Sequence, residues 1–221
     1  INQVKLCTQT IHHSAADKYN HDAMLNKNLS EEQQAAFKHL TQSGDIACVV
    51  GFAGTGKSYM LGAAREAWIA AGYHVQGMTL SGIAAENLES GSGIESHTVA
   101  RQLWYWERGR ERLTNKDIVV IDEAGMLGSR QMAKIVEEAH RAGAKIALVG
   151  DPEQLQAIEA GAAYRAIAER VGFVEMTDIR RQEEGWQQQA TRDFASLRTF
   201  DGLLAYERHD NIHTFNTKDS A

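Results

Sequence analysis

The sequence predicts an α/β fold in which a parallel β-sheet is sandwiched by helices. Apolar runs at residues 46–50, 118–121 and 144–150 alternate with segments of helical character. Strands that alternate with helices in this way are typical of a doubly wound parallel sheet. The first run is continuously apolar and rich in β-branched residues, as expected for a strand that is buried on both faces. Because no internal repeat or low-complexity tract occurs, one compact domain is the simplest interpretation.

Helices are predicted on either side of these strands. Residues 29–44 form a helix that Ser30 caps, and Gln33 stands three residues later, which is the capping-box pattern. Ser129 is expected to cap a helix over 129–143. The other predicted elements are helical stretches over 14–25, 58–71 and 161–172, a strand over 74–80 with a turn and a helix after it, a loop and helix from 91 onward, and a short strand from 173. The chain's last stretch holds scattered aromatic side chains and is assigned no element.

A glycine loop, residues 51–58, follows the first strand. Its sequence GFAGTGKS matches the pattern G-x-x-x-x-G-K-[ST], and Gly54 is an additional glycine. Strand, loop and helix in this order make backbone N–H groups and a helix N-terminus converge on an anion. Lys57 is expected to contact the β- and γ-phosphates of a nucleotide, and the Ser58 hydroxyl to bind Mg²⁺. The alternative is a chance glycine turn, which the flanking strand and helix disfavour. The residues expected to hold the phosphates are Gly51, Gly54, Thr55, Gly56, Lys57 and Ser58.

Two carboxylates, Asp122 and Glu123, directly follow the second strand. Ligands of open α/β sheets bind beyond the carboxyl ends of the strands, so this pair is expected in the same crevice as the glycine loop. One carboxylate can hold Mg²⁺ together with Ser58, and its neighbour can polarise a water for attack on the γ-phosphate. The alternative is a solvated acidic turn, which is common after strands.

Two further strand ends carry polar side chains. Gln154 follows the third strand, and its amide can sense a γ-phosphate because it both donates and accepts hydrogen bonds. Arg180 and Arg181 follow the last strand, and a guanidinium there would neutralise charge that develops on a transferring phosphoryl group. A plain turn amide and a surface basic pair are the alternative interpretations.

The composition fits a soluble globular protein, with 43% hydrophobic and 24% charged residues. No apolar run approaches the roughly 18 residues of a membrane-spanning helix, so no membrane partner is expected. The net charge of −6 argues against a surface coated with phosphate-binding residues, although a local groove can still be basic or aromatic. Cys7 lies far from Cys48, which falls in a buried strand and is expected to be a small hydrophobe, so a cytoplasmic location fits best.

Four segments resemble motifs I to IV of superfamily-one helicases in order and spacing. They are VVGFAGTGKS, VVIDEAGM, LVGDPEQLQAIEAG and DIRRQ. The likeness is greatest to the RecD-like branch, and within it to the helicase part of TraA-type conjugative relaxases. LSEEQQAAF also resembles the Q motif of that branch. The resemblance covers residues 29–182 and implies a P-loop NTPase fold of the RecA-like type.

The resemblance implies a role for individual residues around ATP and Mg²⁺. Gln33 corresponds to the glutamine that contacts adenine. Lys57 and Ser58 bind phosphates and Mg²⁺, Asp122 coordinates the metal, and Glu123 is the catalytic base.

Two further residues are implied to act on the γ-phosphate. Gln154 couples the state of the γ-phosphate to motion, and Arg181 points at the same group. Together with Lys57 and Glu123 they form the expected catalytic set.

The resemblance also implies contacts with single-stranded DNA, through TLSGIAAENL and GIESHTVAR. The residues carried over as DNA contacts are Thr79, Ser81 and His97. Three adjacent aromatic residues are candidates for stacking on bases, with packing in the core or between domains as the favoured alternative: Trp104, Tyr105 and Trp106.

Helicases of this branch need a second RecA-like domain, whose motifs are not found after residue 182. The expected organisation is a lead-in segment over 1–28, a RecA-like ATP-binding motor domain over 29–182, and the start of a connection to the second domain over 183–221. The chain begins without methionine, so it is expected to be a piece of a longer protein. No relaxase site is expected either, since the histidines near the N-terminus, at positions 12, 13 and 21, lack a convincing set of partners.

The leading hypothesis is therefore the first motor domain of an ATP-dependent DNA helicase that acts in plasmid transfer. Its expected partners are single-stranded DNA, the second motor domain and proteins of the transfer complex. The isolated chain is expected to bind nucleotide and to hydrolyse it weakly. A nucleotide-dependent switch or assembly module without unwinding activity and a RecD-like repair helicase are the open alternatives. A small-molecule kinase is disfavoured by Asp122-Glu123 combined with Gln154.

Overall fold

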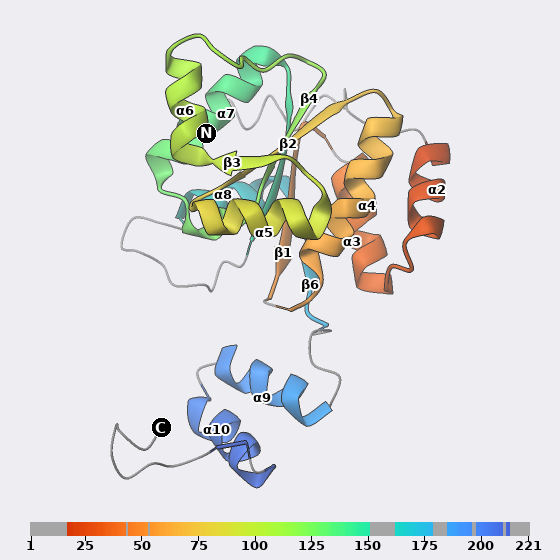
Figure 1. The fold of residues 1–221 in the computed structure, drawn as a ribbon, viewed down its shortest axis with the longest axis vertical. Coiled ribbons are helices and arrows are strands. Elements are labelled where there is room, and N and C mark those ends of the chain that lie inside the picture. The colour runs from red at the N-terminus through yellow and green to blue at the C-terminus, as the bar shows by residue number, and fades with distance from the viewer. Residues whose placement is uncertain are drawn as a thin grey trace. The chain divides into compact units, whose positions relative to one another are not determined.

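The computed structural model describes residues 17–42, 44–52, 54–150, 162–178, 185–195, 198–209 and 211–212. The chain divides into two compact units, Ile1–Asp178 and Ile179–Ala221. The first unit contains a six-stranded parallel sheet with the strand order β3-β2-β4-β5-β1-β6 (Figure 1). The strands are β1 (Ile46–Gly51), β2 (His74–Thr79), β3 (Ser96–Thr98), β4 (Asp117–Ile121), β5 (Lys145–Gly150) and β6 (Phe173–Met176).

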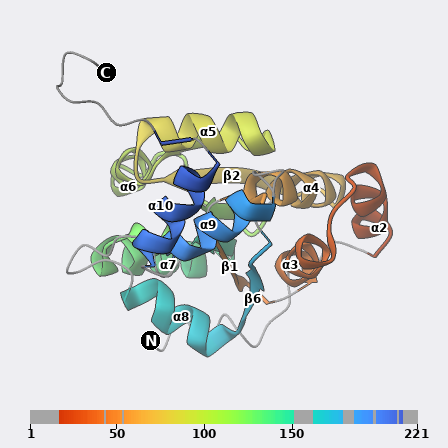
Figure 2. The same cartoon turned by 90° about the horizontal axis from the view of Figure 1, so that it is seen from below.

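Helices cover both faces of the sheet, which confirms the predicted fold class (Figure 2). On one face lie α3 (Glu31–Gln42), α4 (Lys57–Ala70) and α5 (Gly82–Ser92), with α2 (Asp17–Asn26) packed against α4. On the other face lie α6 (Val99–Glu107), α7 (Ser129–Ala142) and α8 (Ala162–Val171), and a short 3₁₀ helix, η1 (Ala124–Met126), follows β4. No helix among the described residues is long and apolar enough to cross a membrane.

The core consists of two hydrophobic clusters, one on each face of the sheet. Side chains alternate between the faces along a strand, so Val49 and Val120 join one cluster whereas Cys48 and Ile121 join the other. Burial raises the pKa of the Cys48 thiol to about 12. This cysteine therefore behaves as a small hydrophobic side chain, as its place in the sequence predicts.

Two local predictions are corrected by the structure. The residue that caps α7 is Gly128, in an extended conformation and without a side-chain hydrogen bond, and Ser129 is already the first helical residue. The short edge strand β3 lies in the stretch from residue 91, where a loop and a helix were predicted. Its sequence, Ser-His-Thr, is too short and too polar to show the pattern of a strand.

The second unit contains α9 (Gly185–Ala195) and α10 (Thr199–Arg208), which pack against each other. Aromatic side chains hold this pair together. Trp186 stacks on His209, with ring centroids 3.9 Å apart, and meets Tyr206 edge to face. Neither helix was predicted, because the side chains that pair are spread over two short helices and show no clear helical period.

Candidate nucleotide-binding site

The glycine loop connects the C-terminal end of β1 to the N-terminus of α4, as predicted. Gly54 and Gly56 have φ angles of 84° and 81°, in the left-handed region that favours glycine. Gly56 also caps α4, and no side chain bonds to the N–H groups of that helix end at the cap. The first turn of α4 therefore presents backbone donors and the positive end of the helix dipole to a bound anion.

The side chains of Lys57 and Thr55 donate hydrogen bonds to backbone carbonyls of the loop. The Lys57 Nζ donates to the carbonyl oxygens of Gly51 at 2.8 Å and Phe52 at 2.9 Å. The Thr55 hydroxyl, which is buried, donates to the Phe52 carbonyl at 2.9 Å. A side chain at Gly51 would lie 3.1 Å from the Lys57 Cδ, so a larger residue there would press on this lysine. The loop thus holds the Lys57 ammonium group against its own backbone.

Gln33 lies against the same loop. Its side-chain oxygen accepts from the Ser30 N–H at 3.1 Å, while its own N–H donates to the Ser30 hydroxyl at 3.3 Å, so the predicted capping box is confirmed. The amide nitrogen of Gln33 donates to the carbonyl of Thr55 at 3.3 Å and lies 3.5 Å from that of Gly56. Gln33 therefore connects the start of α3 to the loop. The sequence indicated the cap, but not the contact with the loop.

Asp122 and Glu123 follow β4, which β5 separates from β1 in the sheet. The turn that they begin packs against the end of β5. A side chain at Gly150 would lie 3.0 Å from the backbone nitrogens of Ala124 and Gly125, so only glycine lets this turn come so close. Glu123 itself has a φ of 55°, which is uncommon for a residue with a side chain and typical of functional sites that store strain.

The charges of Lys57, Asp122 and Glu123 act on one another. Burial raises the pKa of Asp122, while a 2.9 Å hydrogen bond from the Glu123 N–H and the charge of Lys57 oppose that rise. Burial and the neighbouring Asp122 raise the pKa of Glu123, again against the charge of Lys57. The lysine of the loop and the two carboxylates therefore lie close enough for their charges to interact, although they follow strands that are not neighbours.

Ser58 stands in the first turn of α4, where α5 passes close to it. A side-chain carbon at Gly91 of α5 would lie 2.9 Å from the Ser58 Cβ. A hydroxyl and a carboxylate are hard oxygen ligands of the kind that Mg²⁺ prefers. The donor set formed by Ser58 and Asp122 fits this ion, and the glycine-lined loop fits a chain of phosphates.

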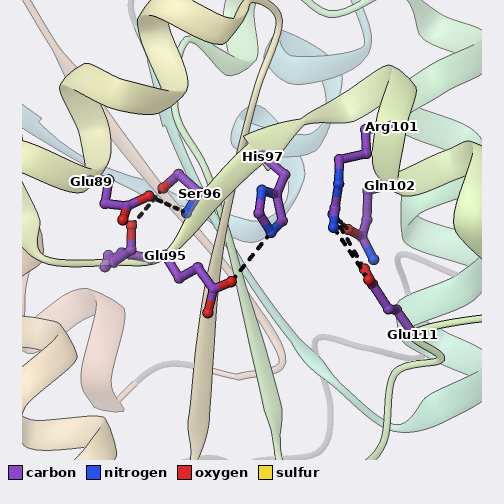
Figure 3. A network of polar contacts seen from close by, with 8 residues as sticks. Glu89, Glu95, Ser96, His97, Arg101, Gln102 and Glu111 are labelled. Carbon is purple, nitrogen blue, oxygen red and sulfur yellow. Dashed lines mark hydrogen bonds and ion pairs between the residues drawn. The ribbon is translucent and has the colours of Figure 1, made fainter.

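The candidate DNA contacts differ in how exposed they are. Thr79 is buried, and its hydroxyl donates to the Ser81 carbonyl at 2.9 Å, while the exposed Ser81 caps α5 by accepting from the Ala84 N–H at 3.1 Å. His97 lies on β3, with its Nε2 3.4 Å from a carboxylate oxygen of Glu95 (Figure 3).

The three adjacent aromatic residues also differ in their surroundings. Trp106 is a core residue, and its indole N–H donates to the Glu111 carbonyl at 3.0 Å. Trp104 is 45% exposed, and the guanidinium of Arg108 lies 3.9 Å from its ring centroid. Tyr105 meets the guanidinium of Arg101, which also pairs with the Glu111 carboxylate (Figure 3). Of the two forms of packing stated above, packing in the core applies to Trp106 but not to Trp104.

The predicted site residues Gln154, Arg180 and Arg181 lie outside the described part of the chain. His12, His13 and Cys7, for which no site is predicted, also lie outside it. His21 falls within α2 and is exposed.

The comparisons with known proteins agree with the motifs. The AAA domain family matches residues 28–217. The conjugal transfer protein TraA of Rhizobium radiobacter is 54% identical over 184 residues, which are 83% of this chain and 17% of that protein. The RecD2 DNA helicase of Deinococcus radiodurans is 31% identical over 160 residues, which are 71% of this chain and 22% of that helicase.

A solved structure of the replication initiator DnaA, bound to AMPPCP and single-stranded DNA, aligns with a TM-score of 0.44 at 15% identity and covers 89% of this chain and 69% of that one. The chain spans about a fifth of the length of the curated relatives it matches. The resemblance to the RecD-like branch and to TraA-type proteins is confirmed. With its glycine loop at the end of β1 and its parallel sheet between helices, the chain belongs to the AAA domain family of P-loop NTPases.

Proposed function

We propose that this chain is the ATP-binding and ATP-hydrolysing first motor domain of a DNA helicase that acts in conjugative plasmid transfer. The observation that carries the proposal is that the charge of Lys57, in the first turn of α4, acts on both Asp122 and Glu123. A cation, two carboxylates and a row of backbone donors are the parts that hydrolysis of a triphosphate requires.

Each residue of the proposed site has a role that its surroundings support. The loop backbone and Lys57 hold the phosphates, and Ser58 and Asp122 hold Mg²⁺, which neutralises charge on the phosphate oxygens when bound. Glu123 orients and deprotonates the attacking water; its raised pKa brings it closer to the working pH of a base. Gln154 and Arg181, from segments outside the described residues, complete the set in this proposal.

Single-stranded DNA is proposed as the substrate because of the relatives and of exposed residues such as Trp104 on α6. RecD2 is named as a DNA helicase and TraA as a conjugal transfer protein, and both match most of this chain. Ser81, His97 and the exposed Trp104 are the candidate contacts with single-stranded DNA. A second RecA-like domain, joined through residues 183–221, is the proposed partner that closes the nucleotide crevice.

Titration of the chain with a fluorescent ATP analogue tests the nucleotide site. Lys57→Ala is expected to weaken binding by at least about tenfold, since it removes the cation that faces the phosphates. Lys38→Ala, at an exposed position of α3, is the control and should bind like the unmodified chain. Equal affinity in both variants would refute the site.

ATP turnover with and without single-stranded DNA distinguishes a motor from a switch. In a longer protein that carries this domain and its second motor domain, DNA is expected to stimulate turnover, and Glu123→Gln is expected to abolish it while nucleotide binding persists. If no nucleic acid changed the rate of ATP hydrolysis, the result would favour the alternative, a nucleotide-dependent assembly module without unwinding activity.

A further inference from the structure

The first turn of α3 contacts two segments at once through adjacent side chains. Gln33 bonds to the glycine loop, as described above. Glu32 binds the chain where it leaves β6. Its Oε2 accepts from the N–H groups of Thr177 at 2.7 Å and Asp178 at 2.9 Å, and its Oε1 accepts from the Thr177 hydroxyl at 2.8 Å.

The loop and the exit of β6 are also neighbours in the sheet. Strand β6 pairs with β1, with Met176 opposite Gly51, and the Phe52 N–H donates to the Met176 carbonyl at 3.3 Å. Nucleotide binding at the loop therefore acts on a backbone that already touches the end of β6. Helix α3 spans the same two segments from one side, through Gln33 and Glu32.

The contacts of Glu32 differ from the ordinary role of an acidic residue in a first helical turn. Both Glu31 and Glu32 lie in the first turn of α3, where a negative charge interacts favourably with the helix dipole. The carboxylate of Glu32 accepts three hydrogen bonds from a segment 145 residues away in the sequence, and Glu31 makes none of these contacts. Charge-assisted bonds through both carboxylate oxygens also fix the direction of the bound backbone.

We propose that Glu32 is a positioning residue that couples the nucleotide-binding loop to the end of the first unit. A change in the loop moves Gln33 and the first turn of α3, and Glu32 transmits this change to Thr177 and Asp178. The second unit begins at the next residue, Ile179, and Arg181 stands three residues after Asp178. The inference rests on the proposed function, because it takes ATP as the ligand of the loop.

Amide hydrogen exchange of Thr177 and Asp178, measured by NMR on the whole chain, tests the contact itself. In Glu32→Gln one of the two acceptor oxygens is lost, so both amides are expected to exchange faster by about tenfold. Glu31→Gln is the matched control: it removes the same charge from the same helical turn and should leave both rates unchanged. Unaltered rates in Glu32→Gln, or the same increase in both variants, would overturn the assignment.

Addition of a non-hydrolysable ATP analogue tests the coupling. In the unmodified chain, saturation with the analogue is expected to change the exchange of Thr177 and Asp178. In Glu32→Gln the analogue should still bind, with an affinity within about twofold, but without that change. Thr177→Ser, which keeps the hydroxyl, should preserve the response, whereas Thr177→Val should weaken it.

The outcomes separate the inference from the proposed function. If the analogue binds the unmodified chain and the two amides do not respond, or if they respond equally in Glu32→Gln, Glu32 does not couple the two segments. If the unmodified chain binds no nucleotide, the proposed function fails and the inference fails with it.

Discussion

Gly91 lies so close to Ser58 that a side-chain carbon on the glycine would be 2.9 Å from the Cβ of the serine and 3.4 Å from its hydroxyl oxygen. The last turn of α5 thus rests on the first turn of α4, at the residue proposed to bind Mg²⁺. The opposite end of α5 begins at Ser81, a candidate DNA contact. One rigid helix therefore connects the two proposed ligand sites.

Gly91→Ala is expected to raise the Mg²⁺ concentration needed for nucleotide binding severalfold, because the new methyl group displaces Ser58. Alanine is favoured over glycine within a helix by about 1 kcal/mol, so this change should not come from a weaker helix. The measurement is a Mg²⁺ titration of nucleotide affinity. Gly82→Ala in the same helix has nothing within 4 Å of the added carbon and is the control. Coinciding titrations for the two variants would show that α5 does not position Ser58.

Gly56→Ala and Gly72→Ala form a matched pair for the contact between Gln33 and the glycine loop. Both glycines have a positive φ, 81° and 85°, so alanine should cost about 1–2 kcal/mol of stability at either position. At Gly72 the added carbon meets nothing within 4 Å, whereas at Gly56 it would collide with the Gln33 amide nitrogen. Urea unfolding should therefore show a further loss of about 1 kcal/mol for Gly56→Ala, and only this variant should bind nucleotide weakly. Equal losses would contradict the contact.

The parts of the fold that depend on local sequence could be predicted. The apolar runs of β1, β4 and β5 are short and rich in β-branched residues, and the capping box of Ser30 and Gln33 is formed by residues three apart. The glycine loop could be predicted for the same reason, since all of its functional parts lie within eight residues.

The contacts between distant segments could not be predicted in this way. That Gln33 bonds to Thr55, or that Gly150 admits the turn after β4, follows from how helices and strands pack. A glycine in the sequence indicates conformational freedom of the backbone, but it does not identify the distant residue that packs against it. The pairing of α9 with α10 escaped prediction too, because it depends on aromatic contacts such as that between Trp186 and His209.

Asp122→Asn is expected to make the chain more stable while it removes the metal site. Burial raises the pKa of Asp122, so the folded chain holds this proton more tightly than the unfolded chain. The stability that this gives is present at low pH and is lost as the pH rises through the folded pKa. Asparagine cannot ionise and does not carry this cost of burial, so it should raise the free energy of unfolding at pH 7 by about 0.5–2 kcal/mol.

Asp117→Asn is the contrasting variant for this measurement. The carboxylate of Asp117 accepts from the N–H and the hydroxyl of Thr114 at 2.7 and 2.6 Å and lies 2.9 Å from the Nδ1 of His74. Its replacement should lower stability by about 1–3 kcal/mol and leave Mg²⁺-dependent binding intact. If urea unfolding at pH 7 showed a loss of stability for both variants, burial of the Asp122 carboxylate would not be destabilising, and the prediction would be wrong.

The burial of Lys145 is expected to make the free energy of unfolding increase at alkaline pH. Lys145 is the first residue of β5, and its fully buried side chain donates to the carbonyl of Gly44. Burial lowers its pKa to about 8 from the ordinary value of 10.5. Between these two values the unfolded chain keeps the proton that the folded chain has released. Stability therefore increases as the pH rises through this window, by about 1.4 kcal/mol per pH unit and roughly 3 kcal/mol in total.

Lys145→Met should abolish this contribution. The unfolding free energy of the unmodified chain should therefore increase relative to that of the variant from pH 7 to pH 10. Urea unfolding of both chains at several pH values measures it, and the comparison cancels groups that titrate in both. Lys38→Met, at an exposed site, should give a curve parallel to that of the unmodified chain. The charge of Lys145 also lowers the pKa of His39, second to burial, so the variant should show a higher pKa for this histidine by NMR. A stability difference that stays constant from pH 7 to pH 10 would mean that Lys145 stays protonated in the fold, and an unchanged pKa of His39 would mean that the charge of Lys145 does not act on this histidine.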